Sequence, residues 1–245
     1  MGETHIRLQN VCFSYSKEKD PVLRDLSFEI DGAESVGLIG ANGAGKSTLL
    51  KLLVGLEEGF EGQIEIEDEP LKPSTVRNIR AKVGYVFQDS ESQLFMSTVG
   101  EDVAFGPENA GLSEEEVSVR VQNALKDVHI EHLKEASVYR ISGGEKKLAS
   151  IATILSMQPK MILMDEPSVA LDPKNRRNLI RILNELKIPK LIASHDLDFI
   201  WDTCPRTILL GRGNLIWDGP TEEIMCNREL LEQHGMELPL SLSRR

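Results

Sequence analysis

The chain lacks what a secreted, membrane-embedded or duplex-binding protein needs. Its 245 residues hold only three cysteines, Cys12, Cys204 and Cys226, which are too scattered for a disulfide framework or a zinc site. Lys and Arg (28) are fewer than Asp and Glu (39), and the net charge of −11 argues against sequence-independent nucleic-acid binding. No apolar run approaches the about 20 residues that span a bilayer, and residues 1–5 lack the pattern of a cleaved signal. We therefore expect a cytosolic chain without a membrane span and without a nucleic-acid partner.

Apolar residues make up 40% of the chain, which is enough to form a core. They occur in strand-like runs that alternate with helical patterns. The expected strands are 6–13, 35–39, 62–67, 82–87, 161–164, 191–193, 207–210 and 214–217. The expected helices are 46–54, 113–128, 142–157, 173–186 and 197–202. Continuous apolar runs such as 161–164 suit parallel strands buried on both faces, and the alternation with helices favours an α/β fold.

Two stretches depart from this alternation. Up to about residue 33 the pattern is typical of antiparallel strands. Residues 89–159 contain helical patterns without a convincing strand, and Val117, Val121 and Leu125 share one helix face. We expect a single domain over 1–245, with a core at about 1–88 and 160–228, an inserted helical subdomain at about 89–159 and a tail at about 229–245. The leucine-rich tail is expected to pack on the core or on another subunit.

Residues 40–47 match the phosphate-binding pattern GxxxxGK[ST], between an expected strand and an expected helix. Glycines let backbone N–H groups point at phosphate oxygens, and the helix N-terminus adds positive potential. Lys46 is expected to reach the β- and γ-phosphates, and Ser47 to bind Mg²⁺. The predicted nucleotide-binding residues of this segment are Gly40, Asn42, Gly43, Ala44, Gly45, Lys46, Ser47 and Thr48. The pattern alone does not separate kinases, GTPases, other ATPases and transporters.

A pair of acidic residues follows the apolar strand 161–164. Asp165 and Glu166 stand at its carboxyl end, which lies beside the phosphate site in sheets of this kind. Asp165 suits the Mg²⁺ shell, and Glu166 is placed to polarise a water for attack on the γ-phosphate. The alternative, a solvated acidic turn, is disfavoured by the buried strand before it.

Residues 141–145, Ile-Ser-Gly-Gly-Glu, open an expected helix about 20 residues before Asp165, and they resemble the LSGGQ signature of ABC ATPases. Other parts of that family's pattern occur in order over nearly the whole chain. They are Tyr15 as the adenine-stacking aromatic, Gln88 as the Q-loop glutamine, residues 168–172 with Asp172 as the D-loop, and His195 as the switch histidine. Taken alone, Tyr15 could be an ordinary strand aromatic and His195 a core histidine.

The resemblance implies an α/β P-loop ATPase with an N-terminal antiparallel β subdomain and a helical subdomain, using ATP and Mg²⁺. It implies that Glu166, His195 and Gln88 are catalytic, and that Ser47, Gln88 and Asp165 hold Mg²⁺, Asp165 directly or through water. It further implies two ATPase subunits, identical or merely related, that close over two ATP molecules. In that closed pair the signature residues Ser142, Gly143, Gly144 and Glu145 face the ATP of the opposite subunit.

Two positions depart from the family pattern. Glu145 stands where glutamine is usual, and a carboxylate about 4 Å from a phosphate charge is repelled by roughly 4 kcal/mol at an effective dielectric of 20. Because Ser142-x-x-Glu145 is also a capping box, we expect Glu145 to turn away from phosphate and cap the helix. Residues 146–148, Lys-Lys-Leu, replace a basic run that usually includes arginine.

Residues 88–107 resemble the ATPases of energy-coupling-factor (ECF) importers, including those for cobalt and nickel, and so does the tail 232–239. Residues 89–92 lack the Asn-Pro often found there. The apolar cluster Leu94, Phe95 and Met96 follows Gln88 and is expected to receive a helix of a membrane subunit; alternatively, it fills the core of the insertion.

The resemblance therefore predicts an ATP-hydrolysing subunit that energises import of a metal ion (cobalt or nickel) or a vitamin. Its partners would be a transmembrane coupling subunit and a substrate-binding membrane subunit, with the chain peripheral at the cytoplasmic face of the membrane. One rival is a soluble ABC ATPase acting on DNA or ribosomes, which usually carries coiled coils or two cassettes. Another is a regulatory ABC subunit without turnover, against which Glu166 and His195 argue.

Overall fold

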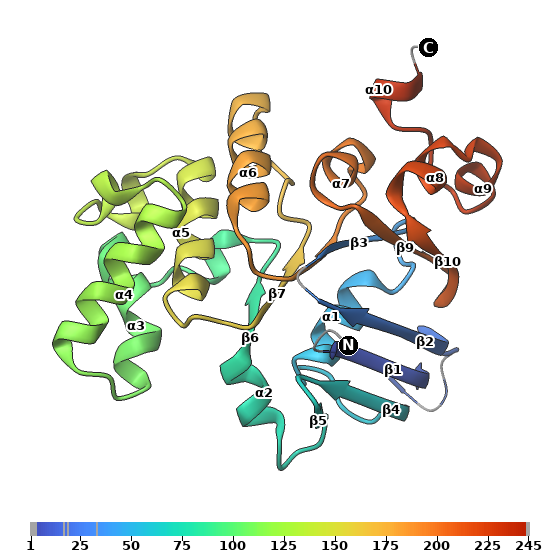
Figure 1. The fold of residues 1–245 in the computed structure, drawn as a ribbon, viewed down its shortest axis with the longest axis horizontal. Coiled ribbons are helices and arrows are strands. Elements are labelled where there is room, and N and C mark those ends of the chain that lie inside the picture. Colours follow the sequence, from blue (N-terminus) through green and yellow to red (C-terminus); the bar gives the residue numbers. More distant parts are fainter. Residues whose placement is uncertain (1–3, 17, 19, 33, 244–245) are drawn as a thin grey trace.

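The computed structural model describes residues 4–16, 18, 20–32 and 34–243, which form two sheets and the helices around them (Figure 1). The smaller sheet is antiparallel and has the order β2 (Leu23–Asp31), β1 (Thr4–Phe13), β4 (Glu61–Ile66), β5 (Glu69–Pro70). The larger has the order β10 (Asn214–Pro220), β9 (Arg206–Gly211), β3 (Ser35–Ile39), β8 (Lys190–Ala193), β7 (Met161–Asp165), β6 (Val83–Val86). Its neighbours are parallel except β9 and β10. The expected α/β class and the antiparallel N-terminal strands are thus confirmed.

The large sheet is buried on both faces, as its continuous apolar strands predict. In β7, Met161 and Leu163 belong to the core under the antiparallel sheet, whereas Ile162 and Met164 belong to the core on the opposite face. Successive side chains of a strand point to opposite faces, so a strand between two cores must be apolar at every position.

The register of this sheet brings three chemically active segments to one edge. Leu38 of β3 pairs with Ala193 of β8, and Ala193 pairs in turn with Asp165 of β7. These three parallel strands therefore end level with one another. The phosphate loop after β3, Glu166 after β7 and His195 after β8 consequently meet at their carboxyl ends.

Ten helices accompany the sheets in the described part of the chain. They are α1 (Lys46–Leu53), α2 (Val76–Lys82), α3 (Val99–Asn109), α4 (Glu114–Asp127), α5 (Gly143–Leu155), α6 (Pro173–Glu185), α7 (Leu197–Thr203), α8 (Thr221–Cys226), α9 (Arg228–Gln233) and α10 (Leu240–Ser243). The five expected helices are present within two residues at each end. Figure 1 shows α3, α4 and α5 grouped on one side of the molecule, beyond β6 and β7.

Helix α3 was not predicted. It contains Gly100, Gly106 and Pro107, residues that lower helix propensity and obscure the apolar period. Its start nevertheless carries a local signal, because Thr98 and Glu101 form a complete capping box.

The tail after α8 packs mainly on the body of the chain. Leu231 is buried, and Leu230, Met236, Leu238 and Leu242 are partly buried against the same core. Leu240 is the exception, with 72% of its surface exposed. Residues 244–245 of the predicted tail, and 1–3 of the predicted core, lie outside the described residues.

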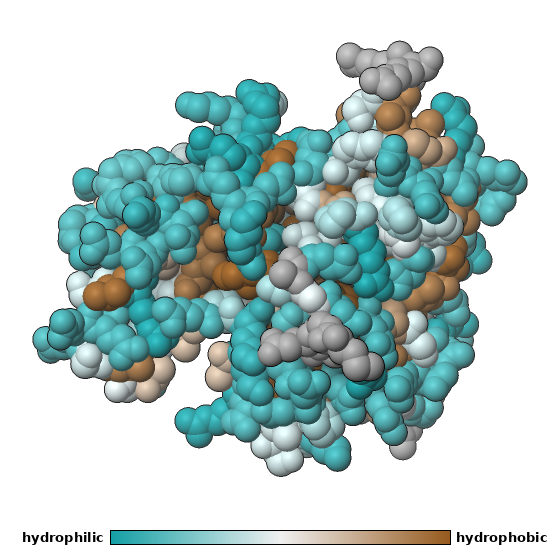
Figure 2. Space-filling view, viewed as in Figure 1, coloured by the Kyte–Doolittle hydropathy of each residue, from teal (hydrophilic) through white to brown (hydrophobic). Residues whose placement is uncertain are grey.

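No helix among the described residues is long and apolar enough to cross a membrane. Figure 2 shows a largely hydrophilic face, on which apolar residues gather in the hollow between the helical lobe and the rest of the molecule.

Candidate functional site

The phosphate loop has the backbone that its glycines permit. Gly40 has a φ of +152°, and a Cβ there would lie 2.4 Å from the carbonyl oxygen of Leu210. Gly45 precedes α1 with a φ of +105°, so the chain turns sharply into the helix. The N-terminus of α1 therefore opens directly onto the loop, an arrangement suited to phosphate.

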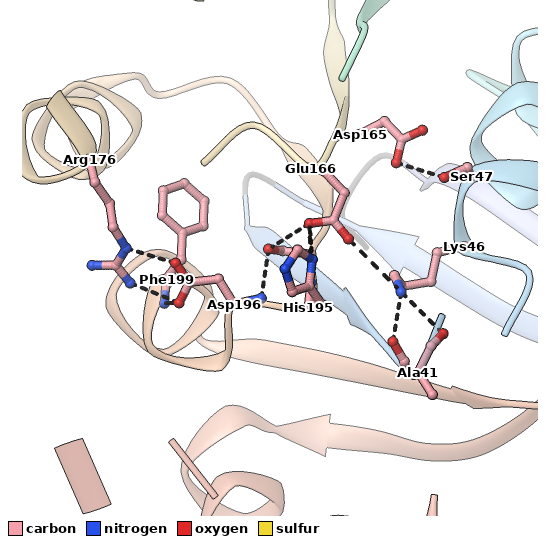
Figure 3. Close-up of polar contacts among 11 residues, drawn as sticks. Ala41, Lys46, Ser47, Asp165, Glu166, Arg176, His195, Asp196 and Phe199 are labelled. Carbon is pink, nitrogen blue, oxygen red and sulfur yellow. Dashed lines mark hydrogen bonds and ion pairs between the residues drawn. The ribbon is translucent and has the colours of Figure 1, made fainter. Parts of the chain in front are cut away.

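Lys46 lies buried beneath this loop, with 7% of its surface exposed. Its Nζ donates hydrogen bonds to the carbonyl oxygens of Gly40 (2.6 Å) and Ala41 (3.4 Å) and lies 4.0 Å from Oε1 of Glu166 (Figure 3). Burial lowers the pKa of Lys46, and Glu166 and Asp165 act against that shift. The ammonium is thus a costly buried charge, and phosphate oxygens are the kind of partner that compensates it.

Asp165 and Ser47 meet across the site, as a shared Mg²⁺ shell requires. Ser47 Oγ donates to Oδ1 of Asp165 at 2.9 Å, and Tyr85 on β6 donates its hydroxyl to Oδ2 at 3.4 Å. Burial raises the pKa of Asp165, and Glu166 adds to the effect. Sequence reasoning did not single out Tyr85; its position one strand away from Asp165 becomes visible only in the sheet order.

Glu166 is held by the segment that follows β8. Its Oε2 accepts hydrogen bonds from Ser194 Oγ (3.2 Å) and the backbone N–H of His195 (3.2 Å), and it lies 2.8 Å from His195 Nδ1. Glu166 also has a φ of +47°, uncommon for a residue with a side chain. Glu166 and His195, both predicted from the sequence, are therefore in direct contact, whereas Ser194 was missed.

A further ion pair fixes the residue after His195. Arg176 of α6 donates two hydrogen bonds to Asp196, at 2.7 and 3.0 Å, and its guanidinium lies 5.6 Å from the ring centroid of Phe199 (Figure 3). Burial raises the pKa of Asp196, but hydrogen bonds from Arg176 and Phe199 outweigh it, so the net pKa is below the ordinary value. Helix α6, which follows the expected D-loop residues 168–172, is thereby attached to the segment that contains His195 and Asp196.

Lys46, Ser47, Glu166 and His195 line one cavity of about 580 Å³, whereas Gly40 and Asp165 lie beside it and are not part of its lining; its volume is within the size range of small-molecule sites. It is lined by Val22, Asn42, Gly43, Ala44, Gly45, Lys46, Ser47, Thr48, Gln88, Glu166, Val169 and His195. Tyr15 stands beside the phosphate loop, half exposed, with its hydroxyl 3.0 Å from Thr48 Oγ1.

The donor set also fits Mg²⁺. Among the described residues, no group of three or more His, Cys, Asp or Glu forms a closed metal cage. Mg²⁺ is usually held by one or two carboxylates together with substrate phosphates and water. The pair Asp165 and Ser47 beside a phosphate loop meets that requirement.

The signature segment, residues 142–145, does not line this cavity. Glu145 accepts hydrogen bonds from the backbone N–H and hydroxyl of Ser142, both at 2.7 Å, which completes the expected capping box. These bonds lower the pKa of Glu145. Among the described residues that line the 580 Å³ cavity, none belongs to 142–145. Asp172, the expected D-loop residue, caps α6 by accepting from the backbone N–H groups of Lys174 and Asn175.

The expected docking cluster is split by the fold. Leu94 is buried in the core with 6% exposure, so it is not part of an exposed patch, because the turn after Gln88 directs it inward. Phe95 is 57% exposed and contacts Phe105 edge to face at 4.8 Å. Met96 is half-buried.

An apolar groove of about 280 Å³ was not anticipated from the sequence. It is lined by Val54, Leu56, Arg80, Ala81, Val83, Gly84, Tyr85, Phe87, Ile154, Met157 and Pro159. Its members come from the segment after α1, from α2 and β6 and from the end of α5 and the residues after it, so only tertiary structure assembles it.

Comparison with known proteins gives the family of this chain. The ABC transporter family model matches residues 23–169. An ABC transporter ATP-binding protein of Gloeobacter violaceus is 49% identical, covering 97% of this chain and 98% of its own length. The energy-coupling factor transporter ATP-binding protein EcfA of Carboxydothermus hydrogenoformans is 38% identical, covering 96% and 87%.

The solved structure of CbiO1 from Clostridium perfringens, described as part of the ABC transporter complex CbiONQ, has a TM-score of 0.86 and 32% identity. The match covers 99% of this chain and 97% of that one. The chain therefore belongs to the ABC transporter ATP-binding proteins, among relatives of the energy-coupling-factor type, and is an ATPase.

Proposed function

We propose that this ATPase is the motor subunit of an ECF-type importer and that it acts in pairs that close over two ATP molecules. The observation that carries the proposal is the placement of Glu166 between His195 (2.8 Å) and Lys46 (4.0 Å) at the wall of the phosphate cavity. A carboxylate held there is in position to orient a water toward the terminal phosphate.

The residues of the cavity have separate tasks in this proposal. Lys46 and the backbone N–H groups of the loop neutralise phosphate charge, which is the main requirement of phosphoryl transfer. Glu166 orients the attacking water, and His195 keeps Glu166 aligned with the γ-phosphate. Ser47, Gln88 and Asp165 are the groups that would hold Mg²⁺, which supplies further charge neutralisation at the phosphates when bound.

A second ATPase subunit, identical or related, completes each site. The two glycines after Ser142 open α5, and a helix N-terminus of this kind favours an anion. Residues 142–145 are absent from the described lining of their own chain's cavity, which supports a role toward the phosphate of a partner. The γ-phosphate would then bridge the two subunits, and hydrolysis would remove the bridge.

Complementation tests this pairing for two copies of the chain. Lys46→Met removes the phosphate lysine and Ser142→Arg blocks the signature, so each variant alone is expected to be nearly inactive. An equimolar mixture should regain measurable phosphate release, at most about a quarter of the wild-type rate, because half of random pairs are mixed, each mixed pair has one intact site of two, and coupling between the sites lowers the rate further. A mixture as inactive as its components would contradict pairing between copies.

The proposed membrane partner docks near the start of the helical subdomain. Phe95 and Phe105 present an exposed aromatic pair, and the 280 Å³ groove lined by Leu56 and Phe87 supplies apolar surface. Exposed apolar surface of this kind marks interaction sites. The relative CbiO1 is described as part of a CbiONQ complex. We infer a transmembrane coupling subunit and a substrate-binding membrane subunit, with the chain peripheral at the cytoplasmic face and a metal ion (cobalt or nickel) or vitamin as cargo.

Phe95→Asp is expected to reduce recovery of membrane subunits at least about tenfold, because a carboxylate in an apolar contact costs more than 1.4 kcal/mol. The measurement is affinity purification of the tagged chain from native membranes, with mass spectrometry of the co-purifying subunits. ATP affinity should not change, since Phe95 lies outside the phosphate cavity.

The matched control is Val119→Asp on α4, which places the same charge at a residue of similar exposure (52%). Recovery from Val119→Asp should equal that of the wild type. Equal recovery of membrane subunits with both variants would show that Phe95 is not part of the docking surface.

A further inference from the structure

Lys147 is a buried lysine that the phosphate site does not explain. It lies on the signature helix α5, two residues after Glu145, and only 3% of its surface is exposed. Its Nζ donates hydrogen bonds to the carbonyl oxygens of Phe87 (3.1 Å) and Gln88 (2.8 Å). A single ammonium thus connects the signature helix to the Q-loop residue that lines the ATP cavity.

Neighbouring side chains reinforce this connection. Gln93 donates from Nε2 to the carbonyl oxygen of Ser150 (2.6 Å) and to Thr153 Oγ1 (2.7 Å), both on α5. Lys146 forms an ion pair with Glu91. The segment 87–93 is therefore attached to α5 at three points, of which Lys147 alone reaches Gln88.

The charge of Lys147 is costly to bury, which bears on why a lysine occupies this position. Among the ion pairs of the described residues, none includes Lys147; its Nζ is held by the two carbonyl oxygens, and the carboxylates of Asp89 and Asp165 attract it from farther away. Burial nevertheless outweighs this attraction and lowers the pKa of Lys147, so the buried charge costs folding free energy. A charge that is costly to bury yet holds the Q-loop backbone is expected of a residue that serves positioning.

We propose that Lys147 is a positioning residue that couples the two ATP sites of the closed pair. The inference rests on the proposed function, in which Ser142 and Gly144 at the start of α5 meet the ATP of the partner. Ser142 and Lys147 are five residues apart, about 7.5 Å along one rigid helix. A shift of α5 on closure is passed through Lys147 to the backbone of Gln88, in the chain's own site.

This arrangement makes ATP binding at one site favour ATP binding at the other site. With two coupled sites, the Hill coefficient of ATP hydrolysis lies between 1 and 2. In Lys147→Met, whose side chain has a similar shape without N–H donors, the Hill coefficient is expected to fall toward 1, because only the coupling through closure itself remains. Lys147→Arg keeps a donor for each carbonyl and should restore cooperativity.

A second measurement does not depend on turnover. Amide hydrogen exchange of residues 88–93 is compared with and without ATP in a Glu166→Gln background. ATP should slow exchange in this segment more when Lys147 is present than in Lys147→Met, in which only the direct contact of Gln88 with the ATP site remains. Should Lys147→Met fail to fold, Lys147→Gln, which has a shorter reach and no charge, takes its place in both measurements.

The chain contains a matched control in Lys190. Lys190 is also 3% exposed, its Nζ donates to two backbone carbonyls, of Leu186 (2.8 Å) and Ile188 (2.7 Å), and burial lowers the pKa of both lysines to about 8. It lies at the start of β8, away from the Q-loop. Lys190→Met should keep both the wild-type Hill coefficient and the ATP effect on residues 88–93.

The possible results distinguish an error in the role of Lys147 from an error in the proposed pairing of subunits. If Glu166→Gln pairs with ATP but Lys147→Met keeps the wild-type Hill coefficient and exchange, the role of Lys147 is wrong and the pairing stands. If Lys190→Met also lowers the Hill coefficient and the ATP effect on exchange of residues 88–93, both changes are a general effect of removing a buried lysine. That result would overturn the proposed role of Lys147. If Glu166→Gln does not pair with ATP, the proposed function fails, and the coupling fails with it.

Discussion

Glu166→Gln is expected to lower the turnover of ATP at least about 100-fold while ATP still binds and a closed pair of subunits accumulates. Glutamine keeps the shape and can still contact Ser194 and His195, but it cannot act as the carboxylate that polarises water. Because only the reacting step is lost, the γ-phosphate remains as the bridge between subunits. Phosphate release measures turnover, and light scattering of the purified chain with ATP measures pairing.

The matched control for this experiment is Glu67. It too is a buried glutamate with 7% exposure, a positive φ (+51°) and a histidine partner, His5, but it lies in the turn after β4, outside the phosphate cavity. Glu67→Gln should weaken the fold and leave turnover near that of the wild type. Near-normal turnover in Glu166→Gln would refute its role, and equal loss in Glu67→Gln would point to a fold defect.

Lys46→Met is expected to weaken ATP binding by about 100-fold, or 2.8 kcal/mol at 1.4 kcal/mol per factor of ten. The ammonium is the buried cation at the phosphate loop, and a neutral side chain cannot replace its interaction with phosphate oxygens. The fold itself should be as stable as the wild type or more so, because burial lowers the pKa of Lys46 and thus disfavours its charged form. Calorimetric titration with ATP and thermal unfolding without ATP measure the two effects.

Lys126→Met, at an exposed position in the last turn of α4, removes the same charge far from the loop. Its ATP affinity should equal that of the wild type. A lower unfolding temperature for Lys46→Met without nucleotide would contradict the view that this buried charge is kept for ligand binding.

Local sequence was sufficient for features whose partners lie close along the chain. The strand 35–39, the glycine loop and the start of α1 at Lys46 are as predicted, because steric demands on φ and helix entry act within a few residues. The same holds for the capping of α5, in which Ser142 and Glu145 are three residues apart. The class of the sheet could also be predicted, since strands between two cores must be apolar throughout.

Helix α3 shows where local reasoning misled. Its two glycines and Pro107 argue against a helix, yet packing overrides propensity: Val99 and Val103 are fully buried, and Asp102 accepts hydrogen bonds from the backbone N–H groups of Phe95 and Met96. Burial of an apolar face against other segments stabilises a helix more than its residue preferences do.

The sequence by itself therefore determined the phosphate loop, the acidic residues after β7 and the family pattern that makes this chain an ATPase. Only the tertiary structure decided which of these residues touch: that Ser194 joins His195 on Glu166, that Tyr85 reaches Asp165, and that Leu94 turns inward while Phe95 stays exposed. It also decided that Lys147 binds the Q-loop, 59 residues away from Gln88 in the chain. Such contacts depend on strand order and helix packing, which bring distant residues together, and no short-range pattern encodes them.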